Sequence, residues 1–529
     1  MTSTNHIVAM LLGTLLIVSA AQTLGDSSPS SLPLSASSLP QSEAVNLHNW
    51  AYAYEFRVSR VVRPSSISDI QSVIRDFVQY PSPVRALGNI HSVTACVVSN
   101  GTIVDMRGMN QILALREDSS GRQIVVVQGG VTLIQVHTWL ADHEIDLSFA
   151  AEIGDATVGS LTSSISKDSG VGDPALTGSL YKSIVGVTYV DHRGDVVKLS
   201  DAKNATALAQ FKSSEGLLGV VVIVELLVRP AKLLTFTNMV IPTAEILEAF
   251  ANMSFQVSPT SNYWLLLHPD YSFVQTRVLA PPGAVETDEV TLGVIVNTTR
   301  ASFAKGLIAV PLTEKSARKP PMQWTTYKHK MVNHYGPLPT PLGNATLGPR
   351  LDFTWFEYPQ ARFQEIVEAY MEFWSAFKKS NNGFEPAAAA TYFVRRIPEK
   401  PHGWFSQTGE GFENPGFSFT LDPIFHDPND PQWEMFLRES VGFARKHGGR
   451  MAVTQTRFVT REDYVSAPGN VALDEAPNAR FTSAYFAQFL KAKTADSTTR
   501  TTKCIPKNVS LPRAAVTTAA TVNAKKADD

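Results

Sequence analysis

The segment 220–228, VVVIVELLV, is almost wholly aliphatic and largely β-branched, and it constrains the fold more than any other part of the chain. Such a run favours a β-strand that is buried on both faces. A strand of this kind needs further layers of secondary structure above and below it. The chain therefore has to form a layered domain with a substantial core, and its 529 residues are enough for more than one such domain.

Strand and helix patterns alternate before this segment, which indicates an α+β fold. A helix is predicted to begin at Ser68, where Gln71 completes a capping-box pattern. Its buried face has helical spacing and consists of Ile70, Val73, Ile74, Phe77 and Val78. The other periodic segments are a helix over 133–143 and strands over 58–62, 84–87, 102–106, 123–127, 184–190 and 196–199.

The two ends of the chain differ in composition from its body. Residues 7–18 are apolar but too few to span a bilayer comfortably, and small residues follow, so residues 1–21 are predicted to be a signal peptide. The alternative is an uncleaved N-terminal anchor. Residues 22–45 form a Ser/Pro-rich leader and residues 491–529 a disordered tail. We expect a secreted glycoprotein without an integral membrane span, since Asn-x-Ser/Thr sequons occur at Asn100, Asn204, Asn252, Asn297, Asn344 and Asn508.

Charge and cysteine content exclude several classes of function. The chain has 46 Lys and Arg against 48 Asp and Glu, a formal net charge of −2, so no basic surplus points to nucleic acid. Its two cysteines, Cys96 and Cys504, are too few for a disulfide framework or a cysteine zinc site, and no metal is expected. An anionic ligand would have to be bound largely by backbone N–H groups.

Glycine and hydroxyl residues gather in segments that could approach such a ligand closely. The turn 88–92, GNIHS, follows a predicted strand, and Gly129 follows another. The segment 154–164 is rich in Gly, Ser and Thr, and Gly219 precedes the apolar run. Residues without bulky side chains let the backbone come close to a bound group.

These segments, in this order, resemble a known family. The segments 57–64, 84–92, 125–133, 151–166 and 213–226 are similar to the FAD-binding domain of vanillyl-alcohol-oxidase-type (PCMH-type) flavoproteins, nearest the D-arabinono-1,4-lactone, L-gulonolactone and alditol oxidases. The resemblance implies a two-subdomain FAD-binding domain over 46–232. It also implies a substrate-binding cap domain of lactone-oxidase type over 233–490, with an antiparallel sheet flanked by helices. The residues that it implies for FAD binding are Gly88, Asn89, Ile90, His91, Ser92, Gly129, Gly154, Thr157, Gly159, Ser160, Ser163, Ser164, Gly219 and Val220.

The turn 88–92 carries the most specific part of the resemblance. In the family a Gly-x-Gly-His-Ser turn wraps the pyrophosphate, and its histidine is bonded to the flavin methyl carbon. His91 and Ser92 match this pattern, whereas Ile90 replaces the second glycine. The resemblance therefore implies FAD attached covalently to His91. A second bond, to a cysteine, is not implied because 154–170 contains none, and Cys96 is expected to be a small buried residue.

Three arginines are candidates for a catalytic cation. Arg395 matches the arginine of the family's Glu-x-Arg strand, with Phe393 in place of the glutamate. Arg450 stands where the family has the lysine of a His-Trp-Gly-Lys motif, and Arg457 follows. A cation near the flavin would stabilise its anionic reduced form. The aromatic segment 478–486 is expected to close the substrate domain, and 165–168 lacks the family's Gly-Thr-His-Gly run and its substrate-contacting histidine.

The predicted function is that of a secreted FAD-dependent oxidase. The resemblance implies that a CH–OH group of a sugar-derived lactone or polyol gives hydride to the flavin, and that O₂ takes the electrons and yields H₂O₂. Gly129 is interpreted as lining the oxygen path, the alternative being an unusual backbone conformation. A second hypothesis is a larger aromatic or terpenoid alcohol as substrate, held by Trp355, Phe393 and Trp404. A third is a binding protein of the same fold without flavin.

Overall fold

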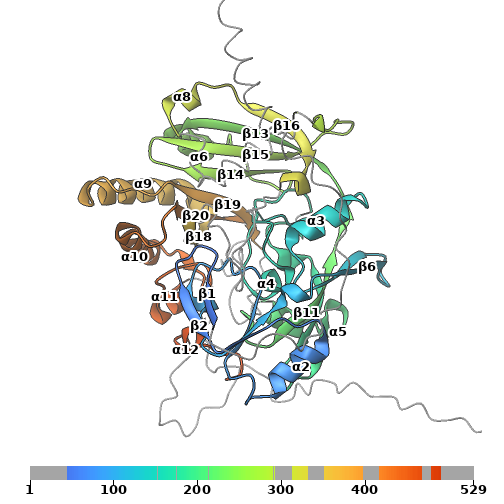
Figure 1. Ribbon diagram of the computed structural model, residues 1–529. Helices are drawn as coiled ribbons and strands as arrows, with labels where there is room; N and C mark the ends of the chain where they lie inside the picture. The colour runs from blue at the N-terminus through green and yellow to red at the C-terminus, as the bar shows by residue number, and fades with distance from the viewer. Residues whose placement is uncertain are drawn as a thin grey trace, which may run out of the picture. The chain divides into compact units, whose positions relative to one another are not determined.

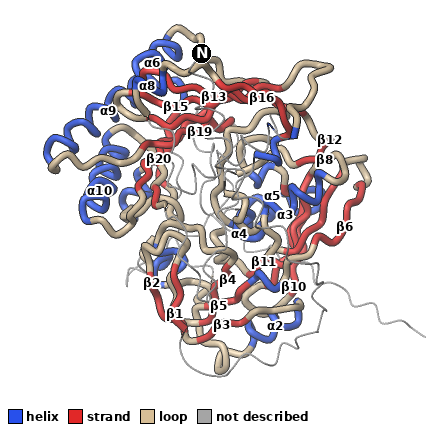
Figure 2. The backbone as a smooth tube through the Cα atoms, turned by 45° about the horizontal axis from the view of Figure 1, so that its top comes forward, coloured by secondary structure: helices blue, strands red, loops and turns tan. Residues whose placement is uncertain are grey.

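The computed structural model describes residues 45–289 apart from 152, 174, 175 and 213, together with residues 291, 312–331, 351–396, 416–467 and 478–489. They belong to one compact unit that ends at Leu490 (Figures 1 and 2). The predicted signal peptide and tail, the leader before Val45, Trp404 and three sequons (Asn297, Asn344 and Asn508) lie outside the described residues. In the ranges that are described, no helix combines the length and the apolar character that crossing a membrane requires.

A small parallel sheet forms the first layer, with the strand order β3-β5-β4 (Figure 2). Helix α2, Ile67–Arg75, packs Ile70, Val73 and Ile74 against this sheet, as its spacing predicts. A short antiparallel pair, β1 and β2, precedes the sheet. The strand bounds are β1 Val45–His48, β2 Glu55–Val58, β3 Arg60–Val62, β4 Val84–Leu87 and β5 Thr102–Asp105.

The ends of helix α2 differ from the prediction. Ser66, and not Ser68, is the N-cap, and the capping box is completed by Asp69 and not by Gln71. A carboxylate accepts stronger hydrogen bonds from backbone N–H groups than an amide oxygen does, which favours the earlier start. The helix also ends before Phe77 and Val78, which are 60% and 96% exposed and are not part of its buried face.

A second, antiparallel sheet has the order β10-β9-β11-β7-β6, with β11 at its centre. Val221 and Val224 of β11 enter a core shared with helix α3, whereas Val220 and Val222 enter the core beneath α2 and the parallel sheet. Both faces of β11 are therefore buried, as its sequence predicts. The bounds are β6 Ile112–Glu117, β7 Gln123–Gln128, β9 Ile184–Val190, β10 Val196–Ser200, β11 Val220–Leu227, α3 Leu133–Ala141, α4 Val158–Ser163 and α5 Asp201–Phe211.

A larger antiparallel sheet begins with β13 at Leu233 and forms the core of the second half of the chain, called the cap below. Its strand order is β16-β13-β15-β14-β19-β20-β18-β21, and β17 pairs with β20. Helices α6, α9 and α10 cover one face of it through a large aromatic core (Figure 1). The bounds are β13 Leu233–Pro242, β14 Ser261–Leu267, β15 Tyr271–Leu279, β16 Met322–Tyr327, β17 Asp352–Phe353, β18 Phe356–Pro359, β19 Ala388–Arg396, β20 Gly416–Phe425, β21 Arg450–Met451, α6 Thr243–Ala251, α9 Phe363–Ser380 and α10 Pro431–Lys446.

The described C-terminal segment, 478–489, contacts both halves of the chain. In the cap, the hydroxyl of Tyr485 donates to the carbonyl oxygen of Val453, and the ring of Phe489 lies 5.9 Å from that of Tyr464. Arg480 is fully buried and donates hydrogen bonds to the carbonyl oxygens of Val73 and Tyr80. Phe481 enters the core beneath α2. Two nitrogens of the buried guanidinium are thus paired with carbonyl oxygens around the end of α2, which holds the start of this segment there.

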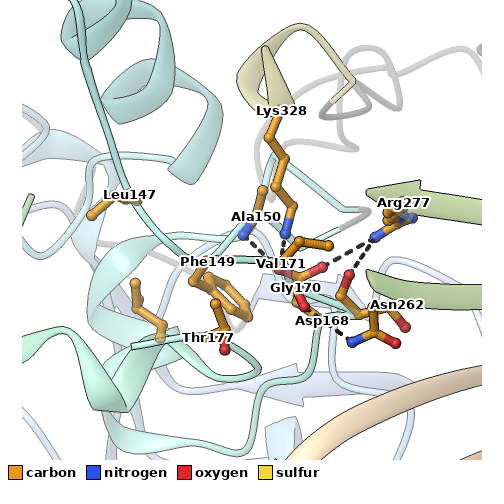
Figure 3. A network of polar contacts seen from close by, with 12 residues as sticks. Leu147, Phe149, Ala150, Asp168, Gly170, Val171, Thr177, Asn262, Arg277 and Lys328 are labelled. Carbon is orange, nitrogen blue, oxygen red and sulfur yellow. Dashed lines mark hydrogen bonds and ion pairs between the residues drawn. The ribbon is translucent and has the colours of Figure 1, made fainter. Parts of the chain in front are cut away.

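The first half of the chain is joined to the cap through the carboxylate of Asp168 (Figure 3). Asp168 is completely buried, and its Oδ2 accepts a hydrogen bond from the backbone N–H of Ala150 at 3.1 Å. Two cap cations bind the same carboxylate: Arg277 of β15, at 3.3 Å, and Lys328, which follows β16. Nearby, Asn262 of β14 donates to the carbonyl oxygen of Gly170 at 3.0 Å.

Asp168 should therefore contribute strongly to stability. Asp168→Asn removes the charge that compensates Arg277 and Lys328, and we expect the free energy of unfolding to fall by about 3–5 kcal/mol. The midpoint of chemical denaturation measures this loss. Asp195→Asn is the control, because that carboxylate is 56% exposed beside Arg75 and should change stability by less than about 1 kcal/mol. Equal losses in the two variants would contradict the role of Asp168.

Candidate active site

A cavity of about 240 Å³ is lined by residues of the first half and of the cap. Most of the residues that the sequence proposes for cofactor binding line it. They are Gly88, Asn89, Ile90, His91, Ser92, Gly129, Thr157, Gly159, Ser160, Ser163, Ser164 and Gly219. Gly154 and Val220 do not line it, whereas Val221, the next residue of β11, does. The turn after β4, helix α4 and the start of β11 thus converge on one space.

The turn 88–92 keeps a glycine-like conformation although Ile occupies its centre. Ile90 has φ +55°, in the left-handed region, and its carbonyl oxygen accepts a hydrogen bond from the backbone N–H of Trp50 at 2.9 Å. A β-branched residue adopts this conformation only at a cost of about 1–2 kcal/mol. The family's glycine at this position therefore has a conformational reason, and the replacement by Ile leaves the turn in place.

His91 stands in the cavity wall as a neutral imidazole. Neither ring nitrogen has a partner among the described residues, although both are buried. Burial lowers the pKa of His91 to about 3, so the ring is uncharged at neutral pH. The ring of Trp50 lies 5.3 Å away. Buried polar atoms are normally paired. An imidazole whose two nitrogens have no partner among the described residues, and which lies among glycines and hydroxyl residues, fits a flavin that would be bound through one of these two nitrogens.

Gly129 is required by the close approach of its neighbours. Its N–H donates to the carbonyl oxygen of Val222, and its own carbonyl oxygen accepts from the N–H of Gly159, both at 2.8 Å. A Cβ at Gly129 would lie 2.6 Å from the carbonyl oxygen of Val221. Its φ is not positive, so the expected alternative, an unusual backbone conformation, is wrong. An alanine at position 129 would therefore disturb the packing. A slower reaction of a Gly129→Ala variant with O₂ would not by itself show that Gly129 lines the oxygen path.

The cap contributes a mainly apolar wall to the cavity, called the cap-side wall below. It consists of Trp264, Leu351, Phe353, Ala390, Tyr392 and Ile424. Alternate residues of a strand face opposite sides. On β19, Ala390 and Tyr392 face the cavity, whereas Phe393 lies in the aromatic core under the helices. Phe393 is therefore no part of the apolar pocket that the sequence suggested.

The three predicted catalytic arginines do not line the cavity. Arg395 lies over the ring of Phe417, with the guanidinium carbon 5.9 Å from the ring centroid. Arg450 forms a fully buried ion pair with Glu357. Arg457 pairs with Asp352, which also accepts a hydrogen bond from the indole of Trp433. The geometry gives no support to a contact between these arginines and a bound cofactor, and their catalytic roles stay predictions.

Charged residues that the sequence analysis missed do line the cavity. Lys167, just after α4, and Asp422 of β20 form a buried ion pair in its wall. Glu215 lies near the start of β11, and burial raises its pKa to about 7. The available signal for Asp422 was a lone carboxylate in the apolar strand LDPIF, 421–425. For Lys167 it was the departure from the family pattern at 165–168.

Comparison with known proteins confirms the recognition of the FAD-binding domain. Residues 58–200 match the model of the FAD binding domain family. L-gulonolactone oxidase of Mus musculus is 26% identical over 206 residues, which are 39% of this chain and 45% of that protein. D-arabinono-1,4-lactone oxidase of Candida glabrata is 23% identical over 206 residues, 39% and 38% of the two chains. L-gulono-1,4-lactone dehydrogenase of Mycobacterium tuberculosis is 27% identical over 173 residues, 33% and 38%.

Solved structures extend the likeness of fold beyond that domain. A cholesterol oxidase from Brevibacterium sterolicum has a TM-score of 0.60 at 13% identity, covering 87% of this chain and all of that one. A solvent-stable cholesterol oxidase has a TM-score of 0.56 at 15% identity, covering 76% and 84%. These likenesses concern the fold alone. The sequence matches span less than half the length of the curated relatives named above.

The left-handed conformation of Ile90 can be tested with two variants. Ile90→Gly and Ile90→Ala both remove the side chain, but only glycine adopts φ +55° without strain. We expect the glycine variant to be more stable than the alanine variant by about 1 kcal/mol. Parallel denaturation curves measure the difference. If the two curves coincide, the turn does not hold this conformation in solution.

Proposed function

We propose that this chain is an FAD-dependent oxidase that removes hydride from a CH–OH group. The observation that carries the proposal is one cavity that joins the cofactor segments to the cap-side wall. Among the described residues, none is a hydrogen-bond partner of His91 in this cavity. FAD supplies the hydride-accepting chemistry, and the protein binds, orients and polarises the substrate. The matched FAD binding domain over 58–200 supports the cofactor.

The residues present fit a flavin dinucleotide along the cavity. The turn 88–92 and helix α4 offer backbone and hydroxyl groups where a pyrophosphate needs hydrogen-bond donors, since basic residues are scarce there. Gly216 and Gly219 line the part of the cavity at the start of β11, where the lack of side chains would let the backbone approach the adenine. His91 would attach the flavin covalently.

Two substrate classes have support. The leading one is a sugar-derived lactone or polyol, because the relatives in the first half of the chain carry lactone oxidase and lactone dehydrogenase names. The second is a larger aromatic or terpenoid alcohol, which the apolar character of the cap-side wall favours. The acceptor is proposed to be O₂, with H₂O₂ as product, although one relative is named a dehydrogenase.

Secretion is part of the same proposal. A signal peptide at 1–21 would direct the chain to the secretory pathway. Among the described sequons, Asn100 and Asn252 are exposed and Asn204 is half-buried, which suits glycosylation.

The function is tested by purifying the full chain and mixing it with candidate donors without oxygen. L-gulono-1,4-lactone and xylitol represent the first class, and vanillyl alcohol and cholesterol the second. Loss of the flavin's visible absorbance identifies a donor, and its return in air together with H₂O₂ identifies an oxidase. Reoxidation by dyes but not by O₂ would overturn the oxidase assignment. A colourless protein that binds no FAD would instead support the flavin-free hypothesis.

The covalent attachment gives a separate prediction. Acid precipitation of the natural protein should leave the flavin in the pellet, whereas His91→Ala should release all of it to the supernatant. His143→Ala is the control, because His143 is exposed just beyond the C-terminal end of α3 and stacks on Trp139. Flavin that is released from the unsubstituted protein would contradict the attachment.

A further inference from the structure

A buried ion pair stands in the wall of the cavity, at the border between the two halves of the chain. Lys167 comes from the segment after α4, and Asp422 from β20, where it lies opposite Ala390 of β19. Their side chains are 14% and 2% exposed, and both line the cavity. Among the described residues of the cap, Asp422 is the only charged one that lines it.

The surroundings of the pair are aromatic. The ammonium nitrogen of Lys167 lies 5.4 Å from the ring centroid of Tyr392, 5.7 Å from that of Phe353 and 5.8 Å from that of Trp355. Aromatic faces attract a cation and exclude water from it. In such a medium each charge acts strongly on whatever polar group approaches.

A pair of this kind is poorly explained by stability alone. The free energy needed to take two charges out of water is about as large as the free energy gained from their attraction. Apolar residues of similar size at the two positions often give a protein that is equally stable. One oxygen of the carboxylate, Oδ1 of Asp422, also has no hydrogen-bond partner among the described residues. A buried acceptor that is left open next to a cation, in the wall of a cavity, indicates a ligand with a donor group.

An alcohol satisfies both members of the pair at once. Its oxygen can accept a hydrogen bond from an ammonium group, and its O–H can donate to a carboxylate oxygen. Amines carry no suitable acceptor when protonated, and carboxylates would be repelled by Asp422. The cap-side wall around the pair would contact the carbon skeleton.

We propose that Lys167 and Asp422 bind the hydroxyl group that is oxidised, with Lys167 Nζ donating to its oxygen and Asp422 Oδ1 accepting its proton. The inference rests on the proposed function. The C–H bond breaks and its electron pair leaves as hydride to the oxidised flavin, which is the oxidant. The O–H bond breaks, its proton moves to Asp422, and the carbon–oxygen double bond forms.

The protonation states suit these roles. Burial raises the pKa of Asp422 to about 6, so the carboxylate is mostly ionised at neutral pH and can accept a proton. Burial lowers the pKa of Lys167. The titratable groups that act on Asp422 are Lys167, Glu357 of β18 and Tyr370 of α9, and Glu357 is itself paired with Arg450. The hydroxyl of Thr420 on β20 also lowers the pKa of this carboxyl. Flavin reduction should therefore speed up as pH rises through about 6 and level off above it.

Binding of benzoate to the holoenzyme, measured by calorimetry, tests the pair without any turnover. Benzoate is an aromatic anion that has to compete with Asp422 for Lys167. Asp422→Asn should tighten its binding at least about tenfold, because a like charge is removed. Lys167→Met/Asp422→Asn should bind benzoate at least about tenfold more weakly than Asp422→Asn does, because the cation is then gone as well. Tighter binding by Asp422→Asn, lost again in the double variant, supports a ligand site, whereas a merely structural pair would give weaker binding in Asp422→Asn.

Anaerobic reduction of the flavin by the best donor of the panel tests the chemistry. Asp422→Asn should slow reduction by roughly 10²–10⁴-fold and remove its pH dependence near 6, at unchanged flavin content. Lys167→Arg, which keeps the charge, should lose less than Lys167→Met. Asp195→Asn, an exposed carboxylate, is the control and should reduce at the normal rate.

The outcomes separate the inference from the proposed function. If no alcohol reduces the natural flavin, the proposed function fails, and the benzoate result alone decides whether the pair is a ligand site. If alcohols reduce it but Asp422→Asn keeps the normal rate and pH profile, the inference is wrong. If Arg395→Ala slows reduction and Lys167→Met does not, the cation is Arg395 and the inference is also wrong. Should a single variant fail to fold, the neutral double variant Lys167→Met/Asp422→Asn replaces it, with loss of benzoate binding as the expected result.

Discussion

The structure depends on the ion pairs that two consecutive residues form with different parts of the cap. Lys167 pairs with Asp422 in the cavity wall, and Asp168 pairs with Arg277 and Lys328 in the body of the cap. All of these groups are buried, so each needs its partner in place. The segment between α4 and β9 is thereby fixed to the cap sheet, and the shape of the cavity follows from that attachment.

The cofactor side of the cavity could largely be predicted from sequence, because its determinants are local. The turn 88–92, the Gly/Ser/Thr-rich segment 154–164 that contains α4, and the doubly buried β11 can each be recognised from a few adjacent residues. The bounds of β9 agree with prediction for the same reason. The N-cap of α2 was predicted at the wrong serine, because Ser66 and Ser68 are both followed by residues that could complete a capping box. Only the hydrogen bonds that Asp69 accepts from the backbone distinguish the two.

The substrate side could not be predicted, because its determinants are pairings between distant strands. In the sequence, Arg450 and Arg457 are candidates for the catalytic cation. In the fold, each forms a buried ion pair, with Glu357 and with Asp352 respectively. Likewise the neighbours Tyr392 and Phe393 face opposite sides of β19, and only the register of the sheet decides which one reaches the cavity. The pair of Lys167 with Asp422 joins segments that no local pattern connects.

The opposite roles of Lys167 and Asp168 have a consequence for how the length of the chain can vary. A substitution at either position removes one contact and leaves the other. An insertion of one residue between α4 and Lys167 would place the cation opposite Arg277 and Lys328, whereas a deletion of one residue would place the carboxylate opposite Asp422. In either case like charges would oppose each other in one buried place, and the other ion pair would be lost as well. Homologous chains that keep these cap charges are therefore constrained to an unchanged spacing here, even where the residues themselves differ.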